Sequence, residues 1–378
     1  MAFSYWESTE WLEGHDLIVI GGGIVGLSAA LQAKKMRPKW KVAVVERDPF
    51  GGGGSTKNAG FACFGSTQEL MHDRMQIGDK SALALLKKRI DGLKLLRMTL
   101  GDASIGYRPC GSLEIVRKHS TFHAPTSAYL KGINEWAASA TGTAETFQSA
   151  TADHLVGIAE DAIEGAVFSP LEGAIDTGKM MRSMRQRVQE AGVDLLFGLE
   201  VIATETDLAG HRIHIKRSGP SGAEDSRWIQ VPHLIIATNA FAQDLLPECD
   251  VKPQKNRVLV TEPIKNLQFD KTVHMDAGYL YVRNIADRML IGGGRHWKLR
   301  NNEVLEKALL EVLHTLWPQT KNASLDSKWT GVLGIGLSRE PIVARVQSGC
   351  VAAVKMGGMG VAIGMQIGQD SVALLLSD

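Results

Sequence analysis

The segment DLIVIGGGIVGLSAALQAKKM, residues 16–36, combines a hydrophobic run, a glycine-rich turn and a helical pattern. DLIVI is a continuous run of apolar, mostly β-branched residues, which predicts a strand buried on both faces of a parallel sheet. IVGLSAALQAKKM has helical periodicity, with two lysines in its last turn and Pro38 just beyond it. KVAVVER, residues 41–47, predicts a second buried strand. The chain therefore opens with a βαβ unit, and we expect an α/β fold with a parallel sheet.

Three glycines in this segment have the spacing of a dinucleotide-binding turn. Gly21, Gly23 and Gly26 form GxGxxG between the predicted strand and the predicted helix, where the helix N-terminus offers aligned N–H groups to a pyrophosphate. Glu46 ends the second strand 20 residues after Gly26, where an acid accepts hydrogen bonds from ribose hydroxyls and disfavours a 2′-phosphate. The alternative is a merely tight strand–helix turn. The motif does not separate FAD from NAD.

The composition excludes several classes of partner. The chain has 378 residues, of which 44% are hydrophobic and 22% charged, so we expect about two globular domains. A formal net charge of +1 provides no broad field for nucleic acid or an anionic membrane, so no nucleic-acid partner is predicted. The longest apolar runs are shorter than the roughly 18 to 20 residues that a spanning helix needs. We therefore predict no membrane span.

The cysteines indicate neither a metal site nor a disulfide framework. Cys63, Cys110, Cys249 and Cys350 are far apart and form no CxxC pair, so reduced thiols in a cytosolic chain are expected. The first 14 residues contain no Lys or Arg and so lack the basic region of a secretory signal. The sequence predicts a cytoplasmic protein without a bound metal.

The rest of the chain alternates between two kinds of segment. HLIIATNAF and the final CVAAVKMGGMGVAIG continue the buried-strand pattern, whereas RVLVTEPI, GYLYVRN and DRMLIGGG predict strands of a separate sheet. Helices are predicted at 81–100, 126–140 and 302–317, and in the first part of 178–201. We predict a nucleotide-binding domain in three parts and an inserted substrate domain in two. The predicted parts are 14–80, 176–245 and 325–378 for the first, 81–175 and 246–324 for the second, and 1–13 as an N-terminal extension.

The segment GGGGSTKNAGFACFG, residues 51–65, predicts a backbone shaped around a ligand. Ser55 and Thr56 offer hydroxyls, Asn58 offers a donor and an acceptor, and the small Ala59 and Gly60 allow a flat ring to lie against the main chain. A flexible linker does not need these side chains. The four glycines that precede them are equally consistent with a binding loop and with a flexible loop that has no binding role.

These segments occur in an order that resembles a known family. GGGIVG, VVER, GSTKNAGFACFG, LEV at 199–201, HLIIATNAF and KMGGMGVAIG resemble, nearly end to end, the FAD-dependent D-amino acid oxidase superfamily, to which glycine, sarcosine and γ-glutamylputrescine oxidases belong. The resemblance implies a discontinuous Rossmann-type FAD-binding domain with an inserted α+β substrate domain of antiparallel sheet and helices. It also implies that FAD accepts a hydride at N5 from the carbon bearing an amine, giving an imine that hydrolyses.

The resemblance extends to single positions. It implies that Ile24 and Val25 meet the pyrophosphate, together with the glycines of the first turn, and that Glu46 and Arg47 meet the adenosine end. The other cofactor-binding positions that it implies are Ser55, Thr56, Asn58, Ala59, Gly60, Val201, Ala237, Thr238, Gly357, Gly358, Met359, Gly360 and Val361.

Four residues are candidates for orienting a substrate. Tyr279, Tyr281 and Arg283 share one face of a predicted strand in the region where the family places pocket aromatics and cations. Arg339, in GLSREP, has a guanidinium that can bind a carboxylate in a fork. The alternatives are a solvated strand face and a surface-loop charge. Cys63 lies in the segment expected to wrap the flavin, where we interpret it as a small apolar filler.

One departure from the family pattern bears on the substrate. Many amino-acid-oxidising members place a carboxylate-binding Arg in a run after a Trp, and here the run after Trp329 has Leu333 at that position. This raises amines or polyamine conjugates as substrates beside amino acids, unless Arg283 or Arg339 substitutes. The alternatives are a flavin dehydrogenase of hydroxy acids or glycerol phosphate and an inactive flavin-holding binding protein. Oxygen and an electron carrier both remain open as electron acceptor.

Overall fold

The computed structural model describes residues 3–207, 210–218 and 224–377. Its first sheet has six strands in the order β18-β19-β12-β1-β2-β8, all parallel except β18 against β19. Both predicted strands of the opening βαβ unit lie side by side in its interior, so the α/β prediction is confirmed. The strands are β1 (Leu17–Ile20), β2 (Val42–Glu46), β8 (Val193–Phe197), β12 (His233–Ile236), β18 (Ile342–Gln347) and β19 (Cys350–Val354).

The two faces of this sheet are covered differently. Leu17 and Val19 of β1 share a hydrophobic core with the helices α1 (Ile24–Met36), α7 (Thr177–Glu190) and α9 (Gly360–Leu376). Ile18 and Ile20 instead pack with a three-stranded antiparallel sheet on the other face. Because successive side chains of a strand point to opposite faces, burial on both sides requires a continuous apolar run. The three strands are β9 (Glu200–Asp207), β10 (Gly210–Ser218) and β11 (Glu224–Val231).

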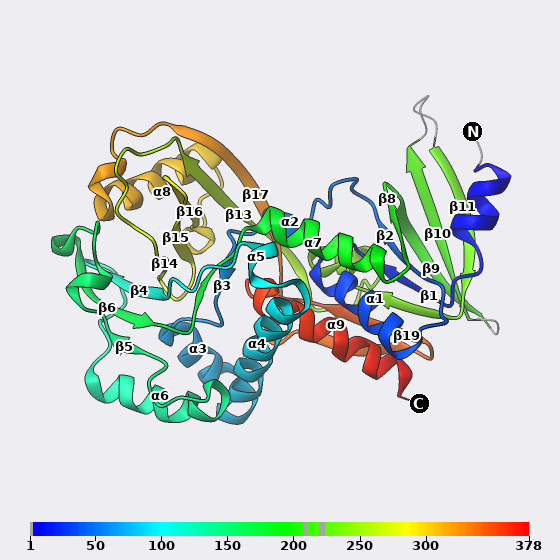
Figure 1. Ribbon diagram of the computed structural model, residues 1–378, viewed down its shortest axis with the longest axis horizontal. Helices are drawn as coiled ribbons and strands as arrows, with labels where there is room; N and C mark the ends of the chain where they lie inside the picture. The colour runs from blue at the N-terminus through cyan, green and yellow to red at the C-terminus, as the bar shows by residue number, and fades with distance from the viewer. Residues whose placement is uncertain (1–2, 208–209, 219–223, 378) are drawn as a thin grey trace.

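A larger sheet lies at the other end of the molecule (Figure 1). It has eight strands in the order β17-β13-β16-β15-β14-β4-β6-β5, and all neighbours are antiparallel except β14 and β4. The helix α8 (Asn302–Leu316) packs against it, with the buried Trp317 at the helix end. The strands are β4 (Ser112–Arg117), β5 (Gln148–Ser149), β6 (Ile163–Ser169), β13 (Lys252–Thr261), β14 (Thr272–Met275), β15 (Leu280–Ile285), β16 (Arg288–Gly293) and β17 (Leu325–Ile335).

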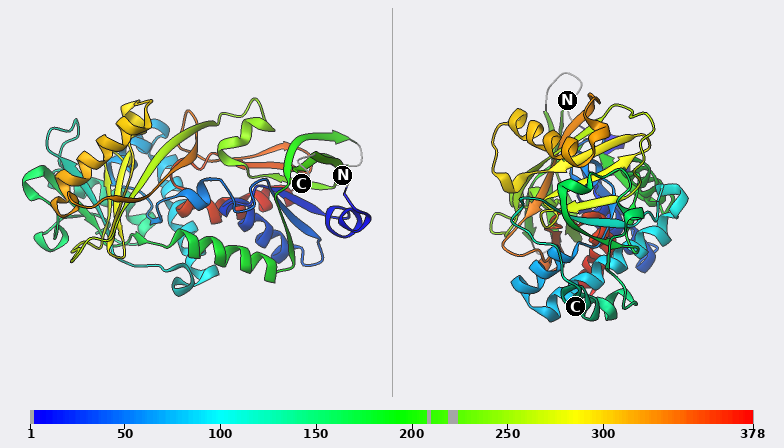
Figure 2. Two further views of the ribbon diagram at one scale, coloured as in Figure 1. Left: turned by 90° about the horizontal axis from the view of Figure 1, so that it is seen from above. Right: turned by 90° about the vertical axis from the view of Figure 1, so that its left-hand side faces the viewer.

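Further helices lie below the larger sheet and between the two ends of the molecule, and α4 packs along α9 where the ends meet (Figures 1 and 2). The helices are α2 (Gly54–Lys57), α3 (Thr67–Ile77), α4 (Asp79–Leu100), α5 (Asp102–Ile105) and α6 (Ser127–Thr141). A two-stranded sheet pairs β3 (Phe61–Ala62) with β7 (Gly173–Ala174). Short 3₁₀ segments lie at Ala152–His154, Glu160–Ala162, Asn239–Asp244, Arg295–Trp297 and Pro318–Thr320, and a π-helix at Glu7–Leu12.

The helix α3 was not predicted from the sequence. Ser66 caps it, since its hydroxyl accepts a hydrogen bond from the Glu69 N–H while the Glu69 carboxylate accepts one from the Ser66 N–H. This capping box is written in the sequence as STQE. Thr67, Glu69, Leu70 and Asp73 are buried, so the buried face of α3 is largely polar and gives little hydrophobic periodicity.

The sheets also bear on the predicted division of the chain. The strand β17 falls in the third part of the predicted nucleotide-binding domain, yet it pairs with β13 in the eight-stranded sheet. The domain boundaries themselves stay a prediction. In the predicted N-terminal extension, Leu12 is buried in the core beneath the three-stranded sheet. Among the described residues, no helix combines the length and apolarity needed to cross a membrane.

Candidate active site

A cavity of about 740 Å³ lies at the carboxyl ends of β1, β2 and β12, and the first glycine turn forms part of its wall. Gly21 has a φ of +112°, and a Cβ on it would lie 2.6 Å from the carbonyl oxygen of Ala237. A Cβ on Gly26 would lie 1.9 Å from the carbonyl oxygen of Gly21, so the turn and α1 require glycine at both positions. The backbone thereby leaves room for a ligand at the start of α1.

Polar groups face this cavity from several elements. The Glu46 carboxylate accepts hydrogen bonds from the N–H of Gly22 (2.8 Å) and of Asp48 (3.0 Å), which holds it at the cavity. Arg47 lies over the ring of Phe241, with 4.1 Å between Cζ and the ring centroid. The hydroxyl of Thr238 is buried and has no hydrogen-bond partner among the described residues. A ligand with hydroxyl or phosphate oxygens would satisfy it.

The glycine-rich segment is ordered by its own side chains. Ser55 Oγ accepts a hydrogen bond of 3.0 Å from the Ile24 N–H, so this segment contacts the start of α1. Asn58 Oδ1 accepts from the Gly60 N–H (2.8 Å) and from the Thr177 hydroxyl (2.8 Å). The four glycines 51–54 line the same cavity. The segment is therefore built into the cavity wall rather than forming a linker.

Most of the predicted cofactor-binding residues line this cavity. They are Gly21, Gly23, Ile24, Val25, Glu46, Arg47, Ser55, Thr56, Asn58, Val201, Ala237, Thr238, Gly357, Gly358, Gly360 and Val361. Ala59 and Met359 line a second cavity instead, and Gly26 and Gly60 line neither.

The second cavity, of about 240 Å³, adjoins the first. It lies between the eight-stranded sheet and the start of α9. The residues that line both cavities are Gly54, Asn58, Leu333, Met356, Gly357, Gly358 and Val361. A ligand extending along the first cavity can therefore present one end to a small molecule in the second.

The predicted substrate-orienting residues separate into two groups. Tyr279, Tyr281 and Arg339 line the second cavity, whereas Arg283 lines neither cavity. Arg283 is 6% exposed, and its Nη1 donates to the carbonyl oxygens of Gly60 (2.5 Å) and Ile175 (2.8 Å). Its guanidinium thus binds main-chain oxygens, one of them in the glycine-rich segment 51–65, and does not face either cavity.

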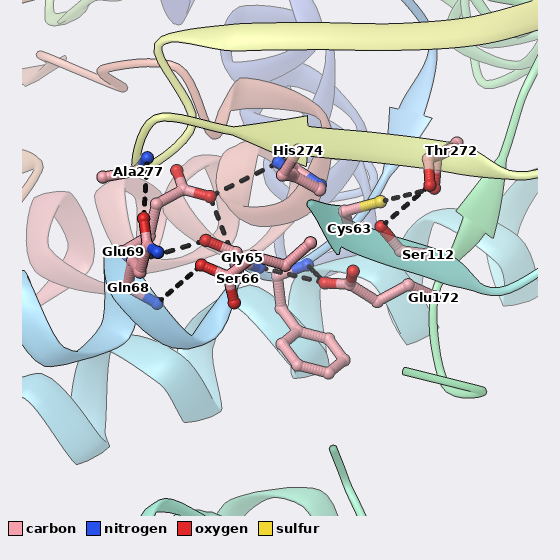
Figure 3. Close-up of polar contacts among 12 residues, drawn as sticks. Cys63, Gly65, Ser66, Gln68, Glu69, Ser112, Glu172, Thr272, His274 and Ala277 are labelled. Atoms are coloured by element: carbon pink, nitrogen blue, oxygen red, sulfur yellow. Dashed lines mark hydrogen bonds and ion pairs between the residues drawn. The ribbon is translucent and has the colours of Figure 1, made fainter. Parts of the chain in front are cut away.

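Arg339 belongs to a charged cluster beside the second cavity. Its guanidinium lies 3.8 Å from Glu69 Oε1 and 3.6 Å from Asp73 Oδ1, and Asp73 also pairs with the buried Arg89 at 2.8 Å. His274 Nδ1 lies 3.4 Å from Glu69 Oε2 (Figure 3). Burial alone raises the pKa of Glu69, but its contact with His274 and the charge of Arg339 lower it well below its usual range. Arg339 is therefore already neutralised by carboxylates.

Arg295 lines the second cavity and was missed by the sequence analysis. Its Cζ lies 4.4 Å from the ring centroid of Tyr279. None of the described carboxylates forms an ion pair with it, and burial lowers the pKa of its guanidinium. The available signal was the GGGR run, in which three glycines at a strand end precede a cation. Arg295 thus faces the cavity as a cation without a carboxylate.

The comparisons with known proteins agree with this geometry. The family model for FAD dependent oxidoreductases (DAO) matches residues 16–374. The chain is 24% identical to the bifunctional protein ThiO/ThiG of Synechocystis, over 84% of this chain and 44% of that protein, so it spans less than half of that relative. It is also 24% identical to gamma-glutamylputrescine oxidoreductase of Escherichia coli, over 96% of this chain and 84% of that protein.

Solved structures share the fold. L-proline dehydrogenase from P. horikoshii superposes with a TM-score of 0.74 at 17% identity, covering 97% of this chain and 94% of that one. Glycine oxidase from Geobacillus kaustophilus superposes with a TM-score of 0.71 at 21% identity, covering 96% and 94%. Since the family model spans nearly the whole chain, this protein belongs to the DAO family of FAD-dependent oxidoreductases.

Proposed function

We propose that this protein oxidises the C–N bond of a small amine that carries a carboxylate. Family membership supports FAD as the cofactor, and bound FAD supplies the acceptor for the hydride that leaves the substrate carbon. The two adjoining cavities support separate binding sites, the first for FAD and the second for the substrate. The guanidinium of Arg295, which forms no ion pair with a carboxylate in the described part of the chain, is the single observation that supports a carboxylate on the substrate.

The residues of the first cavity fit FAD. The glycine turn and the start of α1 would hold the pyrophosphate, and Glu46 would accept hydrogen bonds from a ribose. The unpartnered buried hydroxyl of Thr238 supports a polar ligand at the end of β12. The start of α9 at Gly360 would favour negative charge on the ligand near it, by at most about 2 kcal/mol. That contribution adjusts the cofactor and does not create its chemistry.

The second cavity fits a small polar substrate with an apolar part. Tyr279 and Tyr281 contribute aromatic surface, and burial raises the pKa of Tyr281, so its phenol stays protonated at neutral pH. Arg295 would bind the carboxylate, since the other cations of this cavity that are not exposed already have carboxylate partners. Arg339 lies beside Glu69 and Asp73, Arg89 pairs with Asp73, and Lys355 pairs with Asp250. Arg283, outside the cavity, binds main-chain oxygens. Two relatives with amine-containing compounds in their names, glycine oxidase and gamma-glutamylputrescine oxidoreductase, also support this class.

The residues around the second cavity act by binding and orienting. Glu69 is held by His274 and Arg339, so its charge is already balanced and it offers no free base. The amine would enter as its neutral form, with the carboxylate on Arg295 fixing which carbon faces the shared wall of the two cavities. Leu333, in that shared wall, stands where the family resemblance places an arginine in many members, so the carboxylate would bind to Arg295 instead.

The test is steady-state turnover of the FAD-loaded protein on matched pairs of amines with and without a carboxylate. We expect the amino carboxylates to react, and Arg295→Gln to raise their KM about 10-fold to 100-fold, since charged hydrogen bonds contribute about 1.5–3 kcal/mol. Arg300→Gln, an exposed arginine nearby, is the matched control and should leave KM unchanged. Equal KM values for the two members of a pair, in both wild type and Arg295→Gln, would contradict the proposal.

The electron acceptor is proposed as oxygen or an electron carrier, and peroxide formation in air distinguishes the two. Reduction by hydroxy acids alone would favour the dehydrogenase alternative, and tight FAD that no compound reduces would favour an inactive binding protein. A cytoplasmic location is also proposed, supported by four cysteines that are all free.

A further inference from the structure

We propose that Cys63, Glu172 and His274 bind a divalent transition-metal ion, for which Zn²⁺ is the probe, at the edge of the second cavity. One ligand atom from each residue lies within 4.8 Å of the other two, and all three residues are buried. Cys63 and His274 also line the second cavity. Figure 3 shows the three side chains converging from separate segments. This site is independent of the proposed substrate carboxylate and goes beyond the proposed function.

The fold brings these residues together from distant parts of the sequence. Cys63 follows β3 and Glu172 precedes β7, and these strands pair antiparallel with Ala62 opposite Gly173. Continuing this register by one residue sets Cys63 beside Glu172. His274 reaches the same point from the central part of β14. Because more than a hundred residues separate each ligand from the next, the sequence showed no metal-binding spacing.

The ligand atoms are oriented as they are in known metal sites. His274 directs Nδ1 toward Glu69 Oε2 at 3.4 Å, and its ring also interacts with the Cys63 thiol. The other ring nitrogen, Nε2, is buried and has no hydrogen-bond partner of normal geometry among the described residues. Metal-binding histidines commonly donate their second N–H to a carboxylate, which fixes the ring. The His274 ring therefore has the orientation that a ligand needs.

Glu172 and Cys63 are held in place in the same way. Glu172 Oε1 accepts hydrogen bonds from the N–H groups of Phe64 (2.7 Å) and Gly65 (3.0 Å), which leaves Oε2 available. Cys63 Sγ lies 3.5 Å from the Gly173 carbonyl oxygen and 3.6 Å from a threonine hydroxyl, and it also interacts with the His274 ring. The three donors are one sulfur, one nitrogen and one oxygen, a set that suits Zn²⁺.

The charges of the three ligands suit a divalent cation. A thiolate and a carboxylate that lie side by side in a buried site are costly without a counter-charge. A divalent cation would balance the two negative charges, with neutral His274 as third ligand. Metal binding would release the Cys63 thiol proton and any proton on His274 Nε2 to solvent, so affinity should fall with falling pH. Three protein ligands leave a fourth position open toward the cavity, for water or a bound molecule.

The test uses the FAD-loaded protein, incubated with zinc chloride and then dialysed. We expect about one zinc ion per chain by elemental analysis, and a zinc-edge X-ray absorption spectrum with one sulfur at about 2.3 Å and lighter ligands at about 2.0–2.1 Å. Cys63→Ala should lose the zinc and its sulfur neighbour, whereas the matched control Cys350→Ala, another buried free thiol, should keep both.

A second measurement guards against misfolding of the variants. Zinc should raise the thermal unfolding midpoint of wild type and leave that of His274→Asn unchanged, because a ligand that binds only the native state stabilises it. Substoichiometric zinc in wild type, a spectrum without sulfur, or equal zinc in wild type and Cys63→Ala would overturn the proposal. Each of these outcomes leaves FAD binding and amine oxidation untouched, so the two proposals fail separately.

Discussion

Arg283 Nη1 donates a hydrogen bond of 2.8 Å to the carbonyl oxygen of Ile175, next to the one it donates to Gly60. A residue expected to orient the substrate thus joins the segment around residue 60 to the chain entering α7. The guanidinium is desolvated, and burial lowers its pKa to about 10. These contacts support a role for Arg283 in positioning the glycine-rich segment, which forms part of the wall of the first cavity.

Arg283→Met should therefore act on the protein even without substrate. The substitution leaves buried carbonyl oxygens without donors, so we expect a loss of about 3 kcal/mol in the free energy of unfolding and weaker FAD retention. Chemical denaturation and flavin content after gel filtration measure the two effects. Arg300→Met, at an exposed site, is the control. An unchanged free energy of unfolding would contradict the assigned contacts.

Two glycines should respond to alanine in opposite directions. A Cβ on Gly26 would lie 1.9 Å from the Gly21 carbonyl oxygen, so Gly26→Ala must shift the turn and should lower both stability and FAD affinity. Gly132 lies in α6 and is exposed, and among the described residues a Cβ on it would meet no atom within 4 Å beyond its chain neighbours and the backbone of its own helix. Gly132→Ala should stabilise by about 0.5–1 kcal/mol. Thermal unfolding with and without added FAD tests both.

Glu46→Ala should weaken FAD binding. The carboxylate is held by the N–H groups of Gly22 and Asp48, and its loss removes both an acceptor for the ribose and the order of the first turn. We expect a 10-fold to 100-fold rise in the dissociation constant, on the order of 1.5–3 kcal/mol. Fluorescence titration of the apoprotein measures it, with Glu205→Ala as an exposed control. Equal dissociation constants for wild type and Glu46→Ala would argue against the assigned role.

Glu306→Gln should show a pH-dependent loss of stability. Arg257 Nε (2.9 Å) and Lys328 Nζ (3.0 Å) contact the Glu306 carboxylate. Burial raises the pKa of Glu306, but these contacts outweigh burial and lower that pKa below its usual range. A lowered pKa adds stability that is present above the unfolded-state pKa and is lost as pH falls through the folded-state value.

We therefore expect Glu306→Gln to cost about 1–2 kcal/mol at neutral pH, and this cost should shrink steadily below about pH 4.5. Denaturation at a series of pH values measures it. Glu311→Gln, on an exposed position of the same helix, should show no such dependence. A cost that is constant across the range would mean that the ion pairs do not stabilise the fold.

The sequence was most informative where local pattern and tertiary role coincide. The predicted helix at residues 24–36 has the same bounds as α1, because the glycine turn starts it and the lysines and proline end it. The parallel sheet was predictable because burial on both faces leaves an unbroken apolar run. The helix α3 was not, since its buried face carries Glu69 and Asp73, whose partners come from elsewhere in the chain.

The sequence could not show which side chains reach a cavity or which distant residues come into contact. Strand alternation placed Tyr281 and Arg283 on one face. It could not show which of them would reach the cavity and which would bind the main chain. Arg295 escaped notice because it lies just beyond a strand, in a short 3₁₀ turn. The cluster of Cys63, Glu172 and His274 exists only through the pairing of β3 with β7 and the position of β14.

We propose that the two adjoining cavities serve one reaction, with FAD in the first and an amino carboxylate in the second. Anaerobic titration of the FAD-loaded protein with amino carboxylates, followed by the visible absorbance of the flavin, tests it most directly. We predict that one equivalent of substrate bleaches the flavin of wild type and that Arg295→Gln requires a much higher concentration. A flavin that stays oxidised with every amine offered, or a chain that takes up no FAD, would contradict the account.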